Sequence, residues 1–156
     1  MRSPRVGALA LAGALVLLTG CGAGSQRTPD LSALPLVPGA SFRVKQRVCD
    51  SGSNSYCAWE LVVAGAGYRD SNALFEAEHR LLLSRHWSGA DGDIRSQHAA
   101  DSPGHRLRVT YANPVDELTG TGIFGVRRTQ AIQLALTNAV FGHTSEISML
   151  LEVGAY

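Results

Sequence analysis

Cys49 and Cys57 are separated by a polar, turn-forming run, Asp50 to Tyr56, which can bring the two thiols together. In an oxidising compartment such a pair forms a disulfide, which stabilises a fold by about 2–3 kcal/mol when the loop is short. A zinc site is the alternative, but it needs further Cys or His ligands close by. A redox-active pair usually has the C-x-x-C spacing, which is absent here. We predict a structural disulfide between Cys49 and Cys57.

Five cations alternate with apolar residues in two stretches of the chain. They are Arg43, Lys45, Arg47, Arg106 and Arg108. Alternation with period two places the cations of a strand on the face opposite its apolar side chains. If the two strands are near neighbours, the five cations cover the exposed face of one sheet and can bind an anionic partner. The alternative is a solvated sheet face with interleaved acids such as Glu60.

The histidines form no diagnostic metal-binding pattern. They are His79, His86, His98, His105 and His143, and the sequence has no H-E-x-x-H motif. On a helix, His79 and His86 are two turns apart, about 10.5 Å of rise, which is too far for one metal ion without ligands from other elements. We interpret the histidines as surface residues and predict no metal site.

Residues 120–125 read Gly-Thr-Gly-Ile-Phe-Gly and match the dinucleotide-binding pattern G-x-G-x-x-G. In a dinucleotide fold the first glycine directly follows a buried strand, whereas residues 112–119 intervene here. We interpret the run as a flexible loop and expect no cofactor. The chain has no G-x-S-x-G nucleophile elbow, so we assign no catalytic residue. A catalytic site formed by residues that only the fold brings together is the alternative.

The first 21 residues have the layout of a secretory signal. Arg2 and Arg5 precede an uncharged apolar run, residues 6–18, which is too short to span a bilayer comfortably. The run ends in Leu18-Thr-Gly-Cys21, which resembles the lipobox of bacterial lipoproteins. The resemblance implies cleavage before Cys21, lipidation of its thiol and a lipid-anchored place on the membrane. A plain signal peptide with a chance cysteine is the alternative.

Composition indicates an ordinary globular domain after this signal. The chain has 156 residues, with 14 Lys and Arg against 13 Asp and Glu, which argues against a general nucleic-acid binder. An apolar fraction of 45% argues against wholesale disorder. Prolines and small residues are frequent in residues 22–39. We therefore expect a signal peptide over 1–20, a lipidated N-terminus and flexible linker over 21–39, and one globular domain over 40–156.

Apolar periodicity predicts the elements of this domain. An N-cap at Asp70–Asn72 and leucines at helical spacing predict a helix up to Trp87. Glu78 and Arg85 lie two turns apart near the middle of its leucine face, where they can pair with each other or with groups across the packing surface. Residues 129–141 predict a second helix, although part of this segment also alternates as a strand does. Period-two runs and turn signals predict strands at 41–49, 57–64, 93–99, 105–112 and 146–153.

The element order β-β-α-β-β-α-β predicts an α+β fold. We expect two layers: an antiparallel sheet of about five strands, with both helices packed on one face. The first hairpin contains a conflict, because a Cys49–Cys57 pair within the ladder places the cations on the face of Trp59, Leu61 and Val63. We therefore expect the cysteines to lie in the loop or at a bulge, so that the apolar faces match.

The chain as a whole resembles the small uncharacterised lipoproteins of actinobacteria, and no activity follows from that resemblance. We expect a non-catalytic binding or interaction domain held at the extracytoplasmic face of the cell membrane by the lipid on Cys21. Its partner would be an anionic envelope polymer or a protein. An envelope enzyme or small-ligand carrier is the alternative. A deep pocket with convergent polar groups would favour that alternative, and a flat basic sheet would favour an interaction domain.

Overall fold

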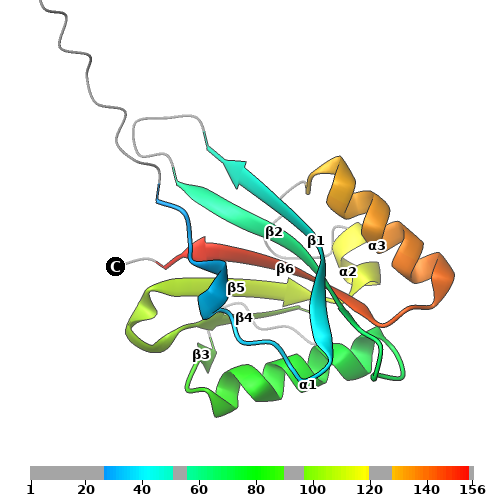
Figure 1. Ribbon diagram of the computed structural model, residues 1–156, viewed down its shortest axis with the longest axis horizontal. Coiled ribbons are helices and arrows are strands. Elements are labelled where there is room, and N and C mark those ends of the chain that lie inside the picture. The colour runs from blue at the N-terminus through cyan, green and yellow to red at the C-terminus, as the bar shows by residue number, and fades with distance from the viewer. Residues whose placement is uncertain (1–26, 51–55, 90–96, 120–127, 155–156) are drawn as a thin grey trace, which may run out of the picture.

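The computed structural model describes residues 27–50, 56–89, 97–119 and 128–154 (Figure 1). The expected signal peptide, Cys21 and the glycine run at 120–125 lie outside these residues, as does the start of the strand expected at 93–99.

The centre of the fold is a six-stranded antiparallel sheet in the order β1-β2-β6-β5-β4-β3. The C-terminal strand β6 lies between β2 and β5, where its apolar residues are buried. The expected α+β class with an antiparallel sheet is confirmed, with six strands instead of five. They are β1 (Ala40–Cys49), β2 (Cys57–Gly65), β3 (Ser88–Gly89), β4 (Gln97–Asp101), β5 (Leu107–Ala112) and β6 (Glu146–Val153).

Three α-helices and two short 3-10 helices complete the described chain. Asp70 caps α1 by accepting a hydrogen bond from the Ala73 amide, as its sequence position predicts. The segment that could be helix or strand is the helix α3. The short helix α2 was missed, although Pro114 at its first position is typical of a helix start. The elements are η1 (Leu31–Ala33), α1 (Ser71–Ser84), η2 (Pro103–His105), α2 (Pro114–Thr119) and α3 (Gln130–Gly142).

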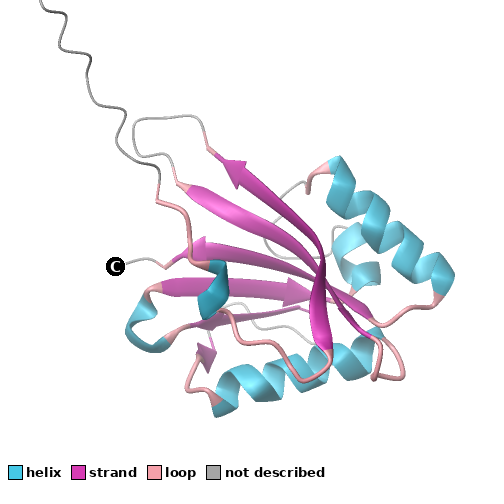
Figure 2. Ribbon diagram, in the orientation of Figure 1, coloured by secondary structure: helices cyan, strands magenta, loops and turns pink. Residues whose placement is uncertain are grey.

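The helices cover both faces of the sheet (Figure 2). Leu61 and Val63 of β2 pack in the core with α1, whereas Val62 between them packs against α3. Successive side chains of a strand point to opposite faces, so α1 and α3 lie on opposite sides. The prediction of both helices on one face is wrong. A near-continuous apolar run such as the one in β2 is typical of a strand buried on both faces.

The first hairpin resolves the register conflict in an unexpected place. Cys49 and Cys57 face each other directly in the ladder and form the predicted disulfide, with Cα atoms 4.0 Å apart. The register shifts between Phe42 and Val44, at the far end of β1. The expectation that the cysteines lie in the loop or at a bulge is therefore wrong. The shift at Arg43 is what allows Phe42 to join the α1-side core.

Residues 27–39, which we call the strap, pack across the α1-side core. Leu34 and Val37 are buried at 5% exposure each, and the indole nitrogen of Trp59 donates to the carbonyl oxygen of Pro29 at 3.1 Å. The prediction of a flexible linker up to residue 39 is wrong for the strap. Its prolines suggested a loose chain, but leucines alternate with them and bury apolar surface.

Candidate functional site

The structure does not bring the five predicted cations together. Lys45 and Arg47 lie on the α1 face of the sheet, whereas Arg108, paired with Glu152 in the ladder, lies on the α3 face. Arg43 also reaches the α3 face, where it forms an ion pair with Glu146 at the start of β6. Arg106 precedes β5 at the end of η2. Strands β2 and β6 separate β1 from β5, so the prediction of one shared basic face is wrong.

A cleft of about 600 Å³ lies where three helix ends meet, at one end of the strands of the sheet. The start of α1 and the start of α2 form two of its walls, and the end of α3 forms the third. The volume is in the range of small-molecule sites, about 300–1,000 Å³. The lining residues are Arg69, Asp70, Ser71, Asn72, Asn113, Pro114, Val115, Asp116, Ala139, Val140, His143 and Thr144.

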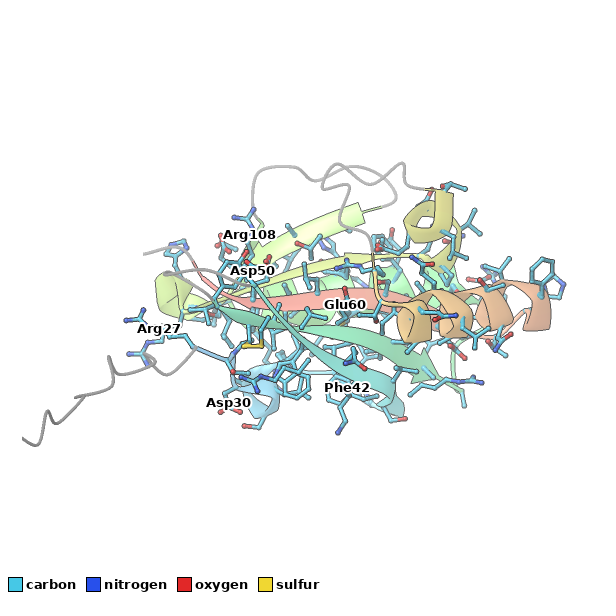
Figure 3. The ribbon with its side chains drawn as sticks, turned by 90° about the horizontal axis from the view of Figure 1, so that it is seen from above. Arg27, Asp30, Phe42, Asp50, Glu60 and Arg108 are labelled. Carbon is cyan, nitrogen blue, oxygen red and sulfur yellow. A yellow bond between two sulfur atoms is a disulfide. The ribbon has the colours of Figure 1, made fainter. Side chains whose placement is uncertain are left out.

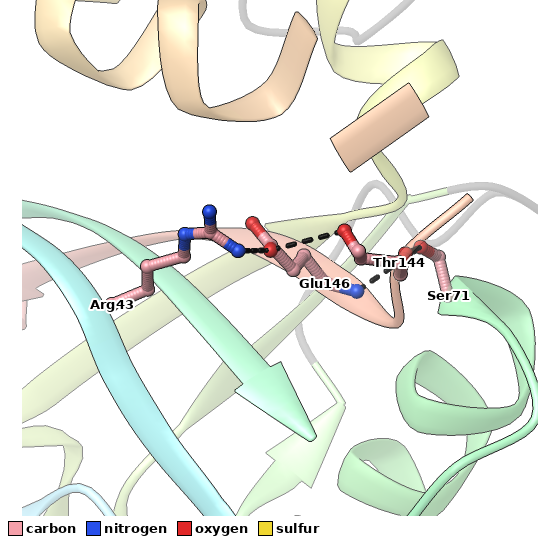
Figure 4. A network of polar contacts seen from close by, with 4 residues as sticks. All are labelled: Arg43, Ser71, Thr144 and Glu146. Carbon is pink, nitrogen blue, oxygen red and sulfur yellow. Dashed lines mark hydrogen bonds and ion pairs between the residues drawn. The ribbon is translucent and has the colours of Figure 1, made fainter. Parts of the chain in front are cut away.

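A polar network fixes the wall between α1 and α3 (Figure 4). The hydroxyl of Ser71 donates to the carbonyl oxygen of Thr144 at 3.1 Å and accepts from the amide of Glu146 at 3.2 Å. The hydroxyl of Thr144 donates to Glu146 Oε1 at 3.1 Å, and Arg43 pairs with the same carboxylate. Glu146 is 1% exposed, so this ion pair is shielded on the carboxylate side. The network holds the α1 start and the residues after α3 in one position.

Amide side chains join the α1 and α2 walls. The side-chain nitrogen of Asn113 donates to Asn72 Oδ1 at 3.3 Å, and Asn113 Oδ1 accepts from the backbone amide of Asp116 at 3.0 Å. The last wall ends at His143, which has the left-handed conformation (φ 50°) that often terminates a helix. Pro114 and Ala139, both buried, are apolar residues of the lining. The cleft therefore combines polar groups from three helices with an apolar lining.

The charges at the cleft favour a neutral or cationic guest over an anion. The Ala73 amide and the Arg69 side chain, which donates to Asp70 Oδ2 at 2.8 Å, hold the pKa of Asp70 below its ordinary value. Asp70 therefore stays ionised at neutral pH, and it already occupies the positive end of α1. Asp116 adds a second carboxylate. Arg69 supplies the cleft's guanidinium, and that group is paired with Asp70.

Two histidines that we expected on the surface form a ring cluster between α1 and the β4–β5 hairpin. The rings of His79 and His98 stack at 4.1 Å, and the Phe75 ring stacks on His98 at 4.8 Å. His79 Nδ1 and the Tyr111 hydroxyl are 2.7 Å apart, and Tyr111 is 1% exposed. The spacing of Phe75 and His79, four residues on one helix face, is the sequence signal for this cluster.

Glu78 is a second buried group that points into the α1-side core. Its side chain is fully buried, and Oε2 accepts from the backbone amide of Val37 in the strap at 3.0 Å. Burial raises the pKa of Glu78 to about 7, and the Val37 hydrogen bond offsets part of that effect. The other carboxyl oxygen has no hydrogen-bond partner among the described residues. The hydrogen bond between the strap and α1 therefore depends on whether the Glu78 carboxyl is protonated.

Buried acids on the α3 face position the start of α3. Glu60, labelled in Figure 3, is 2% exposed. Its Oε2 accepts from both the amide and the hydroxyl of Thr129. Arg128 donates to Glu117 of α2 at 2.5 Å, with both side chains nearly buried. The idea that Glu60 is an interleaved acid on a solvated face is wrong. It caps a helix packed on that face, which a single sequence does not reveal.

The described residues contain no cluster of three or more His, Cys, Asp or Glu side chains suited to a metal ion. Among the same residues, no helix is long and apolar enough to cross a membrane.

At the cleft, the Ser71 hydroxyl is engaged by two backbone groups, so it holds the wall in place. The arrangement is suited to binding a small molecule.

Comparisons with protein-family models, with curated proteins and with solved structures found no match.

Proposed function

We propose that the chain is a lipid-anchored protein of the cell envelope whose extracytoplasmic domain binds a small polar ligand in the cleft. The observation that carries the binding role is the cleft of about 600 Å³, lined by polar side chains that converge from three helices. Binding sites of this kind combine apolar lining with a few placed polar groups. The anchor rests on the resemblance of Leu18–Cys21 to a lipobox.

The lining favours a ligand that is rich in hydrogen-bond donors and neutral or cationic. The carboxylates of Asp70 and Asp116 accept hydrogen bonds only, and the amides of Asn72 and Asn113 accept and donate. Polyols, amino acids and small amines meet this description. The wall is already fixed by the network around Glu146, so little ordering entropy opposes binding.

The binding role is tested by ligand-observed NMR with the lipidated protein in detergent. The probes are sugars, amino acids and polyamines, with organic phosphates as the disfavoured class. Val140→Trp fills the cleft, and Leu83→Trp places the same ring on an exposed position of α1 as a matched control. We expect binding of a donor-rich probe that Val140→Trp abolishes and Leu83→Trp keeps. Binding that persists in Val140→Trp would contradict the assignment of the cleft.

The anchor is tested separately by fractionating cells that express Cys21→Ser. Loss of the acylated thiol should release the protein from the membrane fraction or leave it unprocessed, because two acyl chains supply the anchoring energy. An unchanged membrane fraction, together with an unmodified mass at Cys21 in the parent protein, would refute the anchor.

A further inference from the structure

The packed strap shortens the tether between the lipid and the domain. Because Arg27 is held in the fold by its bridge to Tyr56, about six residues separate Cys21 from the domain, and they can reach at most about 20 Å. A linker extending to residue 39 would reach roughly three times as far. The part of the domain around Arg27 must therefore stay close to the surface that holds the lipid.

Arg27 enters the fold at one end of the strands. We call this end of the sheet, where β2 begins and β6 ends, the tether edge. The backbone of Arg27 bridges to Tyr56, and its carbonyl accepts from the Cys57 amide at 2.9 Å. Four further residues lie across this end of the sheet, each paired with the next on the neighbouring strand: Glu152, Arg108, Asp101 and Ser88. Figure 3 shows Arg27, Asp50 and Arg108 toward the same end of the sheet.

The tether edge exposes more cations than acids. Its exposed arginines are Arg27, Arg47, Arg85 and Arg106, and the exposed acids among its described residues are Asp30 and Asp50. The half-buried Arg108 lies opposite the half-buried acids Asp101 and Glu152 in the ladders, which leaves a small excess of cations. Tyr56, 43% exposed, lies beside Arg27. Tyrosine is enriched where protein meets the membrane interface, because its ring is apolar and its hydroxyl is polar. Charge and composition both fit an anionic lipid surface.

We propose that the tether edge rests on anionic lipid headgroups, an inference that depends on the proposed lipid anchor at Cys21. The short tether brings the edge within reach, and each arginine near an anionic surface favours the docked orientation roughly fivefold. The cleft lies at the opposite ends of the strands, where Ala112 ends β5 and Glu146 begins β6. Strand β2 spans roughly 25 Å, so docking holds the cleft away from the bilayer and open to ligands.

The test measures the distance from the tether edge to the bilayer by energy transfer. With Cys21 acylated and the other two cysteines in a disulfide, Ser88→Cys supplies a free thiol for a fluorophore at this edge. The lipidated protein is placed in vesicles of phosphatidylcholine alone or mixed with phosphatidylglycerol, each with an acceptor on the headgroups. We expect higher transfer in the anionic vesicles and a decrease with added salt.

Matched charge reversals complete the test. Arg47→Glu with Arg106→Glu changes the tether edge, and Lys45→Glu with Arg80→Glu makes the same charge change elsewhere on the surface. The first pair should lower the ratio of docked to lifted molecules at least roughly 30-fold, and the second should leave it near the parent value. Equal transfer in both vesicle types, or equal effects of the two pairs, would overturn the docking. A protein without lipid at Cys21 would overturn the anchor and the docking together, and mass measurement of the purified protein identifies that case.

Discussion

Replacing Glu78 by Gln should remove much of the loss of stability between pH 4.5 and 7. The carboxyl has a pKa of about 7 in the fold, raised by burial from the ordinary value of 4.5. Between these two values the folded protein holds a proton at Glu78 that the unfolded chain has released. The free energy of unfolding should therefore fall as pH rises from 4.5 to 7, by about 3 kcal/mol in total.

The Glu78→Gln variant keeps the shape of the side chain and an oxygen that can accept from the Val37 amide, but its amide does not titrate. At pH 4.5 the variant and the parent should have similar stability, and above pH 7 the variant should be more stable by up to about 3 kcal/mol. Urea denaturation of the two proteins across this pH range measures the difference.

Glu76→Gln is the matched control, because Glu76 is exposed on the same helix. This variant should keep the pH dependence of the parent. A parallel loss of stability in Glu78→Gln and the parent between pH 4.5 and 7 would show that Glu78 is not the group responsible.

Three further changes test the packing of the fold. Replacing Cys49 and Cys57 by Ala should cost about 2–3 kcal/mol in urea denaturation, because the short loop is no longer closed in the unfolded chain; no loss would show that the disulfide is strained or unformed. Glu117→Gln should cost up to about 3–5 kcal/mol, because it removes the carboxylate that the nearly buried Arg128 guanidinium contacts directly; a neutral result would mean that water reaches this pair. Gly154→Ala should lower the melting temperature, because a Cβ there would lie 1.9 Å from a backbone oxygen at the end of η2; an unchanged melting temperature would show that the chain end shifts freely.

The elements whose apolar residues recur with a clear period were predictable from the sequence. The face of the sheet on which each helix packs was not. The helix capped by Asp70 and the strand at 146–153 follow from local signals that need no partner. The second covered face did not follow, because the alternate positions Trp59, Leu61 and Val63 indicate one apolar face, whereas Val62 between them packs on the other. A strand that is apolar at consecutive positions predicts cover on both faces.

The cleft could not be predicted, because its walls come from three helix ends that are distant in sequence. Ser71, Asn113 and Thr144 are ordinary capping and turn residues when each is seen alone. The strap was missed for a different reason. Its prolines, which mark turns, are interspersed with leucines that find a core only when the sheet and α1 are in place.

The most direct measurement of the central claim is an amide NMR titration of the isotope-labelled, lipidated protein with the tightest-binding donor-rich probe. We expect shifts concentrated at the cleft, at Ser71, Asn113 and His143, with the amide of His98 in the ring cluster unchanged. Shifts confined to the ring cluster or the tether edge, or no shift with any probe, would contradict it.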